Sequence, residues 1–193
     1  MAFNINEFTK NGLNLGGARP TLFDVTLTIP TNIQGIDLNG VRKFRFTCKA
    51  TSAPASSIAP IDVGYFGRVV KVAGDRTFSD WNVNVINDED FVVRDTFEAW
   101  HNAINTIVSN RKTVSGNAYT GTGVITQYSK NGDVIKQYEI FDMFPTNVSD
   151  MTLSWEAQNQ IQEFGVTFAY NYWIPVIRAN GTSINPDDTT VTV

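Results

Sequence analysis

The most constraining feature of this chain is residues 72–90, which place a turn, a strand and a helix start in direct succession. Apolar residues alternate with asparagines over residues 81–85, the pattern of a half-buried strand. Gly74-Asp75 is expected to form the turn before that strand. The polar, acidic run 87–90 suits a helix N-cap and first turn. This stretch therefore predicts a sheet strand leading directly into a helix.

The helix that follows is amphipathic and is expected at about residues 89–109. Its apolar residues fall at steps of four, three, four and three: Val93, Phe97, Trp100, Ile104 and Ile107. We expect this face to pack on the strand before it, with Trp81 and Trp100 buried at the joint between sheet and helix.

Other segments show the alternation typical of strands. The expected strands are residues 23–29, 43–49, 61–65, 68–72, 119–128, 134–144, 151–155 and 164–174. Asn131-Gly132 predicts a hairpin turn, and Phe66-Gly67 separates two short strands. Residues 31–41 and 50–60 are expected to be connections. The pattern predicts a mainly β fold, an antiparallel β-sandwich or barrel with one flanking α-helix and extended terminal arms.

The chain length of 193 residues suits one domain with arms. Residues 1–20 are rich in Asn and Gly and are expected to form an N-terminal arm. Residues 21–174 are expected to form the β-barrel domain, and residues 175–193 a C-terminal extension with a final weak strand at 189–193. The N-terminus lacks the pattern of a signal peptide, and no apolar run predicts membrane insertion.

Composition argues against several functions. The net charge of −4 argues against a basic nucleic-acid-binding face. The single histidine, His101, and the single cysteine, Cys48, exclude a Cys/His zinc site within one chain. Lys43, Arg45 and Lys49 alternate with aromatic residues, which indicates a solvated or subunit-contact face rather than a nucleic-acid site. We expect no enzyme activity, no metal and no cofactor.

Two charged groups leave alternatives open. Asp88, Glu89 and Asp90 could act as paired carboxylates, but stabilisation of a helix N-terminus is the favoured interpretation. Asp75 and Arg76 form either a local turn pair or a subunit contact, because an arginine can bind carboxylate or carbonyl groups bidentately.

Several of these segments together resemble the tail tube proteins of T4-like contractile-tailed phages. The motifs occur in family order: 18–23 (ARPTLF), 74–78 (GDRTF), 80–81 (DW), 87–89 (NDE), 144–148 (FPTNV), 153–155 (LSW) and 170–173 (YNYW). The N-terminal arm, residues 31–41 and residues 175–193 depart from the compact family pattern. The resemblance and the patterns above give nine candidate structural and assembly residues: Asp75, Arg76, Trp81, Asp88, Trp100, Pro145, Asn147, Trp155 and Trp173.

The resemblance implies a structural virion protein. Such proteins form stacked hexameric rings of the inner tail tube, through which double-stranded DNA passes into the host without specific binding. It implies the tail sheath, baseplate and tape-measure proteins as partners, and assembly in the host cytoplasm. A tube-initiating baseplate protein and the tube of a phage-derived contractile injection system are the alternatives. Polar positions that could line the lumen are Thr26, Thr28, Asn82 and Asn84.

Overall fold

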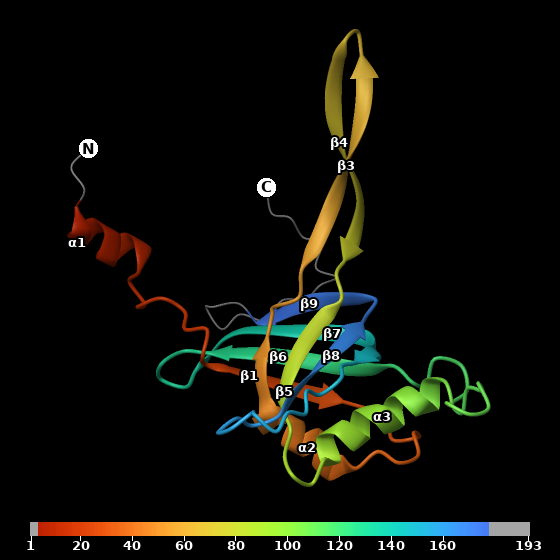
Figure 1. Ribbon diagram of the computed structural model, residues 1–193. Coiled ribbons are helices and arrows are strands. Elements are labelled where there is room, and N and C mark those ends of the chain that lie inside the picture. The colour runs from red at the N-terminus through yellow and green to blue at the C-terminus, as the bar shows by residue number, and fades with distance from the viewer. Residues whose placement is uncertain (1–3, 178–193) are drawn as a thin grey trace.

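Strand β7 (Val134–Val148) belongs to both layers of a β-sandwich in the computed structural model, which describes residues 4–177 (Figure 1). One layer has the strand order β1-β6-β7-β9, and the other has the order β2-β5-β8-β7. All pairings are antiparallel. The remaining sandwich strands are β1 (Phe23–Thr28), β2 (Cys48–Thr51), β5 (Trp81–Ile86), β6 (Gly121–Tyr128), β8 (Glu163–Ala169) and β9 (Tyr172–Ile177).

β7 changes layers at a local irregularity. Its first part pairs with β6 and β9, and its last part, from Phe144 on, pairs with β8. Near the end of the first part, Asp142 has φ 54° at a register shift between the Met143–Gly121 and Ile140–Gly123 pairs. The register shifts again between Pro145 and Asn147. A bulge bends a strand and increases its twist, which lets one strand pass from one sheet to the other.

The core lies between the layers and follows the period-2 pattern of the strands. In β5, Trp81, Val83 and Val85 are buried while the asparagines between them are exposed. Phe168 of β8 is fully buried, and Trp81 stacks on it with ring centroids 5.4 Å apart. The alternation predicted for residues 81–85 is confirmed.

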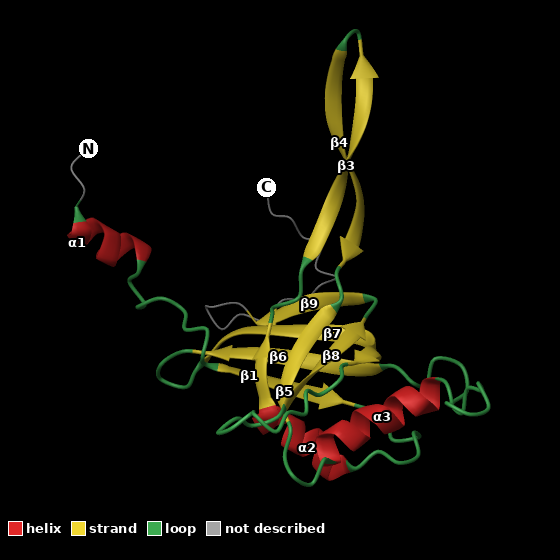
Figure 2. Cartoon of the chain, viewed as in Figure 1, coloured by secondary structure: helices red, strands yellow, loops and turns green. Residues whose placement is uncertain are grey.

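Two helices, α2 (Leu38–Thr47) and α3 (Val92–Ile104), pack against each other below the sandwich (Figure 2). The buried face of α3 contains Val93, Phe97 and Trp100. Gly40 lets α2 approach closely, since a Cβ there would lie 2.2 Å from the Thr96 hydroxyl oxygen. A short α-helix, α1 (Ile5–Glu7), continues into a single π-helical segment, η1 (Phe8–Gly12), away from the sandwich.

A long hairpin projects from the sandwich on the side away from α2 and α3 (Figure 1). It consists of β3 (Ser56–Tyr65) and β4 (Arg68–Phe78), which pair only with each other within the described residues. Its turn has φ 43° at Phe66 and φ 80° at Gly67, and positive φ at both central residues is typical of the type I′ turn.

The mainly β, antiparallel sandwich is confirmed, but several local predictions are wrong. Residues 43–47 form the second half of α2, and only residues 48–49 lie in a strand, at the start of β2. The helix forms because Asp37 caps it by accepting a hydrogen bond from the Asn39 backbone N–H. Within the described residues the fold therefore has two flanking helices, not one. α2 also begins inside residues 31–41, which were expected to be a loop.

Gly74-Asp75 lies inside β4, so the turn before β5 is at residues 79–80 instead. The two short strands expected at 61–65 and 68–72 are parts of the longer hairpin, which begins inside the connection expected at 50–60. A Cβ at Gly74 would lie 2.5 Å from the Ala59 carbonyl oxygen, so this glycine permits a close strand approach rather than a turn.

The end of the chain also differs from the prediction. Residues 151–155 form a loop, and the strand expected at 164–174 is divided into β8 and β9 by residues 170–171. β9 continues to Ile177, past the expected start of the C-terminal extension at 175. The weak strand expected at 189–193 lies outside the described residues.

Helix α3 spans residues 92–104, shorter than the expected 89–109. Ile104 is half-buried, and Ile107 is 89% exposed, so the predicted apolar face ends one turn early.

Candidate assembly surface

The projecting hairpin has one apolar face and no core beneath it. Directly opposite residues of an antiparallel pair share a face, and the pairs Ile61–Val72 and Val63–Val70 lie on the same side of the hairpin. These side chains are 46–54% exposed. Period-2 alternation with an apolar face normally marks a buried side of a sheet. This face is therefore suited to contact with another chain.

The other face of the hairpin is polar at its centre. Asp62 lies opposite Lys71 there, and the lysine Nζ lies 2.9 Å from the Asp62 carboxylate. Exposed ion pairs of this kind contribute little to stability. The hairpin therefore has one apolar and one polar face, as is typical of a strand pair that is covered on only one side.

Asp75 and Arg76 lie in β4 near the base of the hairpin, and both are exposed. As strand neighbours they point to opposite faces, and within the described residues no ion pair joins them. The local turn pair considered for them is therefore wrong, and the subunit contact stays a prediction.

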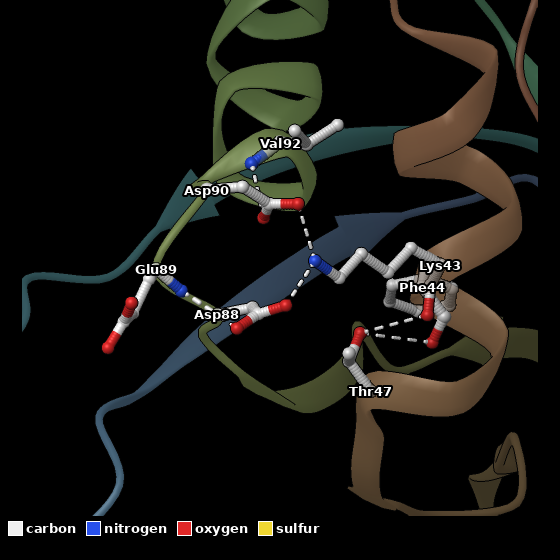
Figure 3. Close-up of polar contacts among 7 residues, drawn as sticks. All are labelled: Lys43, Phe44, Thr47, Asp88, Glu89, Asp90 and Val92. Carbon is white, nitrogen blue, oxygen red and sulfur yellow. Dashed lines mark hydrogen bonds and ion pairs between the residues drawn. The ribbon is translucent and has the colours of Figure 1, made fainter.

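The end of the sandwich opposite the hairpin is acidic. Lys43 of α2 forms ion pairs with Asp88 and Asp90, the latter at 2.6 Å (Figure 3). Hydrogen bonds to the two carboxylates raise the pKa of Lys43, and the hydrogen bond from Lys43 lowers the pKa of Asp88. The acidic run thus ties α2 to the start of α3.

This run caps α3 less directly than predicted. The residue before the helix is Phe91, with φ 54° and no side-chain cap, while Asp90 accepts a 3.3 Å hydrogen bond from the Val92 N–H. Asp88 instead accepts from the Glu89 N–H. The expected helix-terminal role therefore belongs to Asp90, and Asp88 serves mainly as the partner of Lys43.

Residues 149–162, which we name the Trp155 loop, lie beside this acidic run. Asn87 joins the two through hydrogen bonds to Gln162, 2.8 Å each from its backbone N–H and side-chain amide. The loop is mostly polar, but three large apolar side chains are exposed on it. Leu153 is 83% exposed, Ile161 70% exposed, and Trp155 has no burial at all.

Three of the candidate residues meet in the core. Trp81 and Trp100 both contact the ring of Phe168, and Pro145 pairs with Phe168 across the β7–β8 ladder. The Trp100 indole N–H donates a 2.7 Å hydrogen bond to the Tyr119 carbonyl. These candidates hold the sandwich together and lie within the folded subunit.

The remaining candidates are dispersed. Asn147 is exposed in the last part of β7 and pairs with Thr167 of β8, directly after the register shift. Trp173 in β9 is half-buried, and its ring packs edge-on to Tyr138 at 5.5 Å between centroids. The structure therefore brings the nine candidates together at no single site.

The sequence prediction missed the apolar face of the hairpin and the full exposure of the Trp155 loop. The sequence does contain a signal for the apolar face of the hairpin, since apolar residues alternate at 61, 63 and 65 and again at 70 and 72. This alternation predicts the two strands, but it does not distinguish burial within the subunit from burial in an assembly.

Within residues 4–177, no group of three or more His, Cys, Asp or Glu side chains is arranged to hold a metal ion. None of the helices in that range has the length and apolarity to cross a membrane.

The fold and its surfaces define a class: a small antiparallel β-sandwich with open sheet edges and a projecting amphipathic hairpin, as in proteins that assemble with copies of themselves. The sequence profile of the phage tail tube protein family matches residues 18–176. The chain belongs to this family, and the resemblance noted in its sequence is confirmed.

Individual relatives agree with this assignment. The chain is similar to tail tube protein gp19 of Enterobacteria phage T4, with 38% identity over 158 residues that cover 81% of this chain and 90% of that protein. It is 24% identical to the tail tube protein of Serratia phage KSP90 over 168 residues, covering 86% and 93% of the two chains.

Solved structures share the fold. A chain of the sheath/tube terminator of the extracellular contractile injection system PVC aligns with a TM-score of 0.60 at 14% identity, covering 82% of this chain and 96% of its own. A chain of the PVC sheath–tube complex in its extended state aligns with a TM-score of 0.56 at 12% identity, covering 95% and 100%. At such identities the likeness concerns the fold alone.

Proposed function

We propose that this chain builds the inner tube of a contractile phage tail as stacked hexameric rings. The observation that carries the proposal is the amphipathic β3–β4 hairpin, whose apolar face has no partner among the described residues of its own chain. A two-stranded hairpin about 33 Å long is at best marginally stable in water when its apolar face is uncovered. In a tube, a neighbouring subunit covers that face.

Lateral contacts between subunits are main-chain strand pairing. Within the described residues, β1, β2 and β9 lie at sheet edges and present backbone groups for another strand. Pairing such edges between neighbours in a ring closes the sheets into a continuous barrel, which removes the edges. The hairpin and the arms then serve contacts between rings.

The lumen is lined by polar rather than basic side chains. Asn82 and Asn84 are exposed on the outer face of β5 and are the candidates for this lining. Thr28 is exposed on β1, on the outer face of the other layer, and so faces away from the lumen. The chain has a net charge of −4, and polar side chains do not neutralise DNA phosphates. Contact with such a wall therefore releases few counterions from the DNA, so duplex DNA passes without adsorbing.

The partners that follow are the tail sheath outside the tube, the baseplate at its end and the tape-measure protein within it. The protein acts through assembly and not through catalysis, within a virion assembled in the host cytoplasm. A tube-initiating baseplate protein is a second candidate, because the fold alone does not distinguish it from a tube protein: a chain in a structure of the anti-feeding prophage baseplate shares the fold, with a TM-score of 0.58 at 12% identity.

The proposal is tested by electron microscopy of the full chain grown on purified baseplates. Wild-type protein is expected to form tubes with sixfold cross-sections, incorporated along the whole length. Val63→Asp, on the apolar face of the hairpin, should stop growth, whereas the matched Val69→Asp on the opposite face should not. Absence of wild-type tubes, or incorporation confined to the baseplate end, contradicts the proposal.

A further inference from the structure

We propose that the Trp155 loop of one copy is the receptor for the apolar face of the hairpin of a second copy. This inference rests on the proposed function and specifies which surfaces meet between rings. Its partner is a second copy of this chain, and the contact joins two different surfaces of the same molecule.

The two surfaces lie at opposite ends of the sandwich. β5 begins at Trp81, three residues after the hairpin ends, and it finishes at Ile86, which pairs with Glu163 directly after the Trp155 loop. β5 therefore spans the distance between them, and the hairpin projects away from the loop (Figure 1). Contacts between different patches that do not close into a ring generate filaments.

Both surfaces present apolar side chains that are uncovered within the described residues. The loop offers the fully exposed indole of Trp155, flanked by Leu153 and Ile161. The hairpin offers a flat aliphatic face built from Ile61, Val63, Val70 and Val72. A rigid aromatic anchor on an aliphatic surface is the usual centre of a protein–protein contact.

Charge favours this pairing over another exposed apolar surface. Arg68 lies opposite Tyr65 on the apolar face of the hairpin, while the loop contains Asp150 and Glu156; none of these three makes an ion pair within the described residues. Attraction between Arg68 and the two acidic side chains of the loop sets the register of the contact.

The groove between β1 and α2 is the competing surface. It is lined by apolar Leu27, Val41 and the 82%-exposed Phe46, but also by Arg42 and Arg45. Arg45 is neutralised by Asp24 at 2.5 Å, whereas Arg42 has no ion pair among the described residues. A basic groove repels a hairpin face that contains Arg68, so the acidic loop is the better receptor.

Disulfide trapping tests the contact in assembled tubes. In a Cys48→Ser background, Leu153→Cys is combined with Val63→Cys in one chain and, as the matched control, with Val69→Cys on the opposite hairpin face. Oxidation should link the Val63 variant into a ladder of dimers, trimers and longer chains, while the control stays monomeric on a denaturing gel. Equal ladders from both variants overturn the inference.

Substitution gives an independent measurement. Trp155→Ala should raise the protein concentration needed for tube growth by about tenfold or more, whereas Phe46→Ala should leave it unchanged. Normal growth of the Trp155 variant refutes the receptor role while leaving the tube function standing. If wild-type chains grow no tubes on baseplates, the proposed function fails and the inference fails with it.

Discussion

Trp81 and Phe168 face each other across the β5–β8 ladder, with their rings stacked 5.4 Å apart at an interplanar angle of 30°. Both side chains are at most 1% exposed. The Phe168 ring also contacts Phe97 and Trp100 of α3, at 5.8 and 6.1 Å between centroids. This ring is thus the point at which sheet and helix join.

Removing the indole at this joint should be costly. Trp81→Ala is expected to lower the free energy of unfolding of the unassembled chain by about 3–5 kcal/mol, through lost burial and a residual cavity. The matched control is Trp155→Ala, which removes the same ring from a fully exposed position and should change stability by less than about 0.5 kcal/mol. Urea unfolding of the two variants checks the prediction, and equal midpoints would contradict it.

Gly40 provides a second test, because helix propensity and packing act in opposite directions there. In an exposed helix, Gly→Ala stabilises by about 1 kcal/mol. At Gly40 the added methyl would press on Thr96 and on the Val92 carbonyl, so we expect a loss of about 1–3 kcal/mol. Asn39→Ala, at the exposed neighbouring position, should not destabilise. Thermal unfolding distinguishes the two, and a Gly40→Ala variant more stable than wild type would show that the helices can separate without cost.

The Lys43–Asp88 pair predicts a defined pH window. Because the folded pKa of Asp88 is lowered, its contribution is present above the ordinary aspartate pKa of about 3.9 and is lost as the pH falls through the lower, folded value. Because the pKa of Lys43 is raised, its contribution is present below about 10.4 and is lost as the pH rises through the folded value. The melting temperatures of wild type and Lys43→Met should therefore differ between about pH 5 and pH 9 and converge in strong acid. A difference that persists under strong acid would assign the effect to packing instead.

Cys48 should react slowly while the chain is folded. Burial, together with the nearby Asp24 carboxylate, raises the pKa of its thiol to about 12. Relative to a free thiol of pKa about 8.5, the thiolate fraction at pH 8 falls by about three orders of magnitude. Alkylation by iodoacetamide should accordingly be slow in buffer and fast in urea, as followed by mass spectrometry. Rapid labelling of the native chain would contradict the burial of this side chain.

The N-terminal segment should be dispensable for folding. The side chains of residues 4–20 are exposed, and among the described residues α1 and η1 contact mainly each other. Deleting residues 1–17 should leave the free energy of unfolding within about 0.5 kcal/mol of wild type. Tube growth on baseplates should weaken, because apolar Ile5 and Phe8 are then missing from contacts between rings. Unfolding curves and negative-stain microscopy measure the two effects, and unimpaired growth would remove the arm from the assembly.

The sequence was informative wherever burial is completed within one chain. Alternation at Trp81 and Val83, and the helical spacing of Phe97 and Trp100, identified side chains that are buried in the structure. Residues 43–49 were misassigned because apolar Phe44 and Phe46 alternate as in a strand, yet only Phe44 is buried, packing on Phe97 from α2. The helix signal was the preceding Asp37 cap.

The assembly surfaces were harder to predict for a physical reason. Leu153 and Trp155 alternate like strand residues, but no strand among residues 4–177 covers them. The alternation of apolar and polar residues indicates which side of a segment is apolar, but it does not indicate which molecule covers that side. The hairpin and the Trp155 loop could therefore be located by the fold, and only the family resemblance suggested that other copies lie beside them.

The shared strand β7 has a mechanical consequence. Since it pairs with β6 and β9 in one layer and with β8 in the other, the two layers are joined by an unbroken backbone as well as by side-chain packing. A shearing load applied to one layer reaches the other through covalent bonds, so the layers cannot slide apart without first tearing the ladder of β7. A tube wall made of such subunits resists axial force as a shell whose layers are covalently joined, and not as two sheets held together by side-chain packing alone.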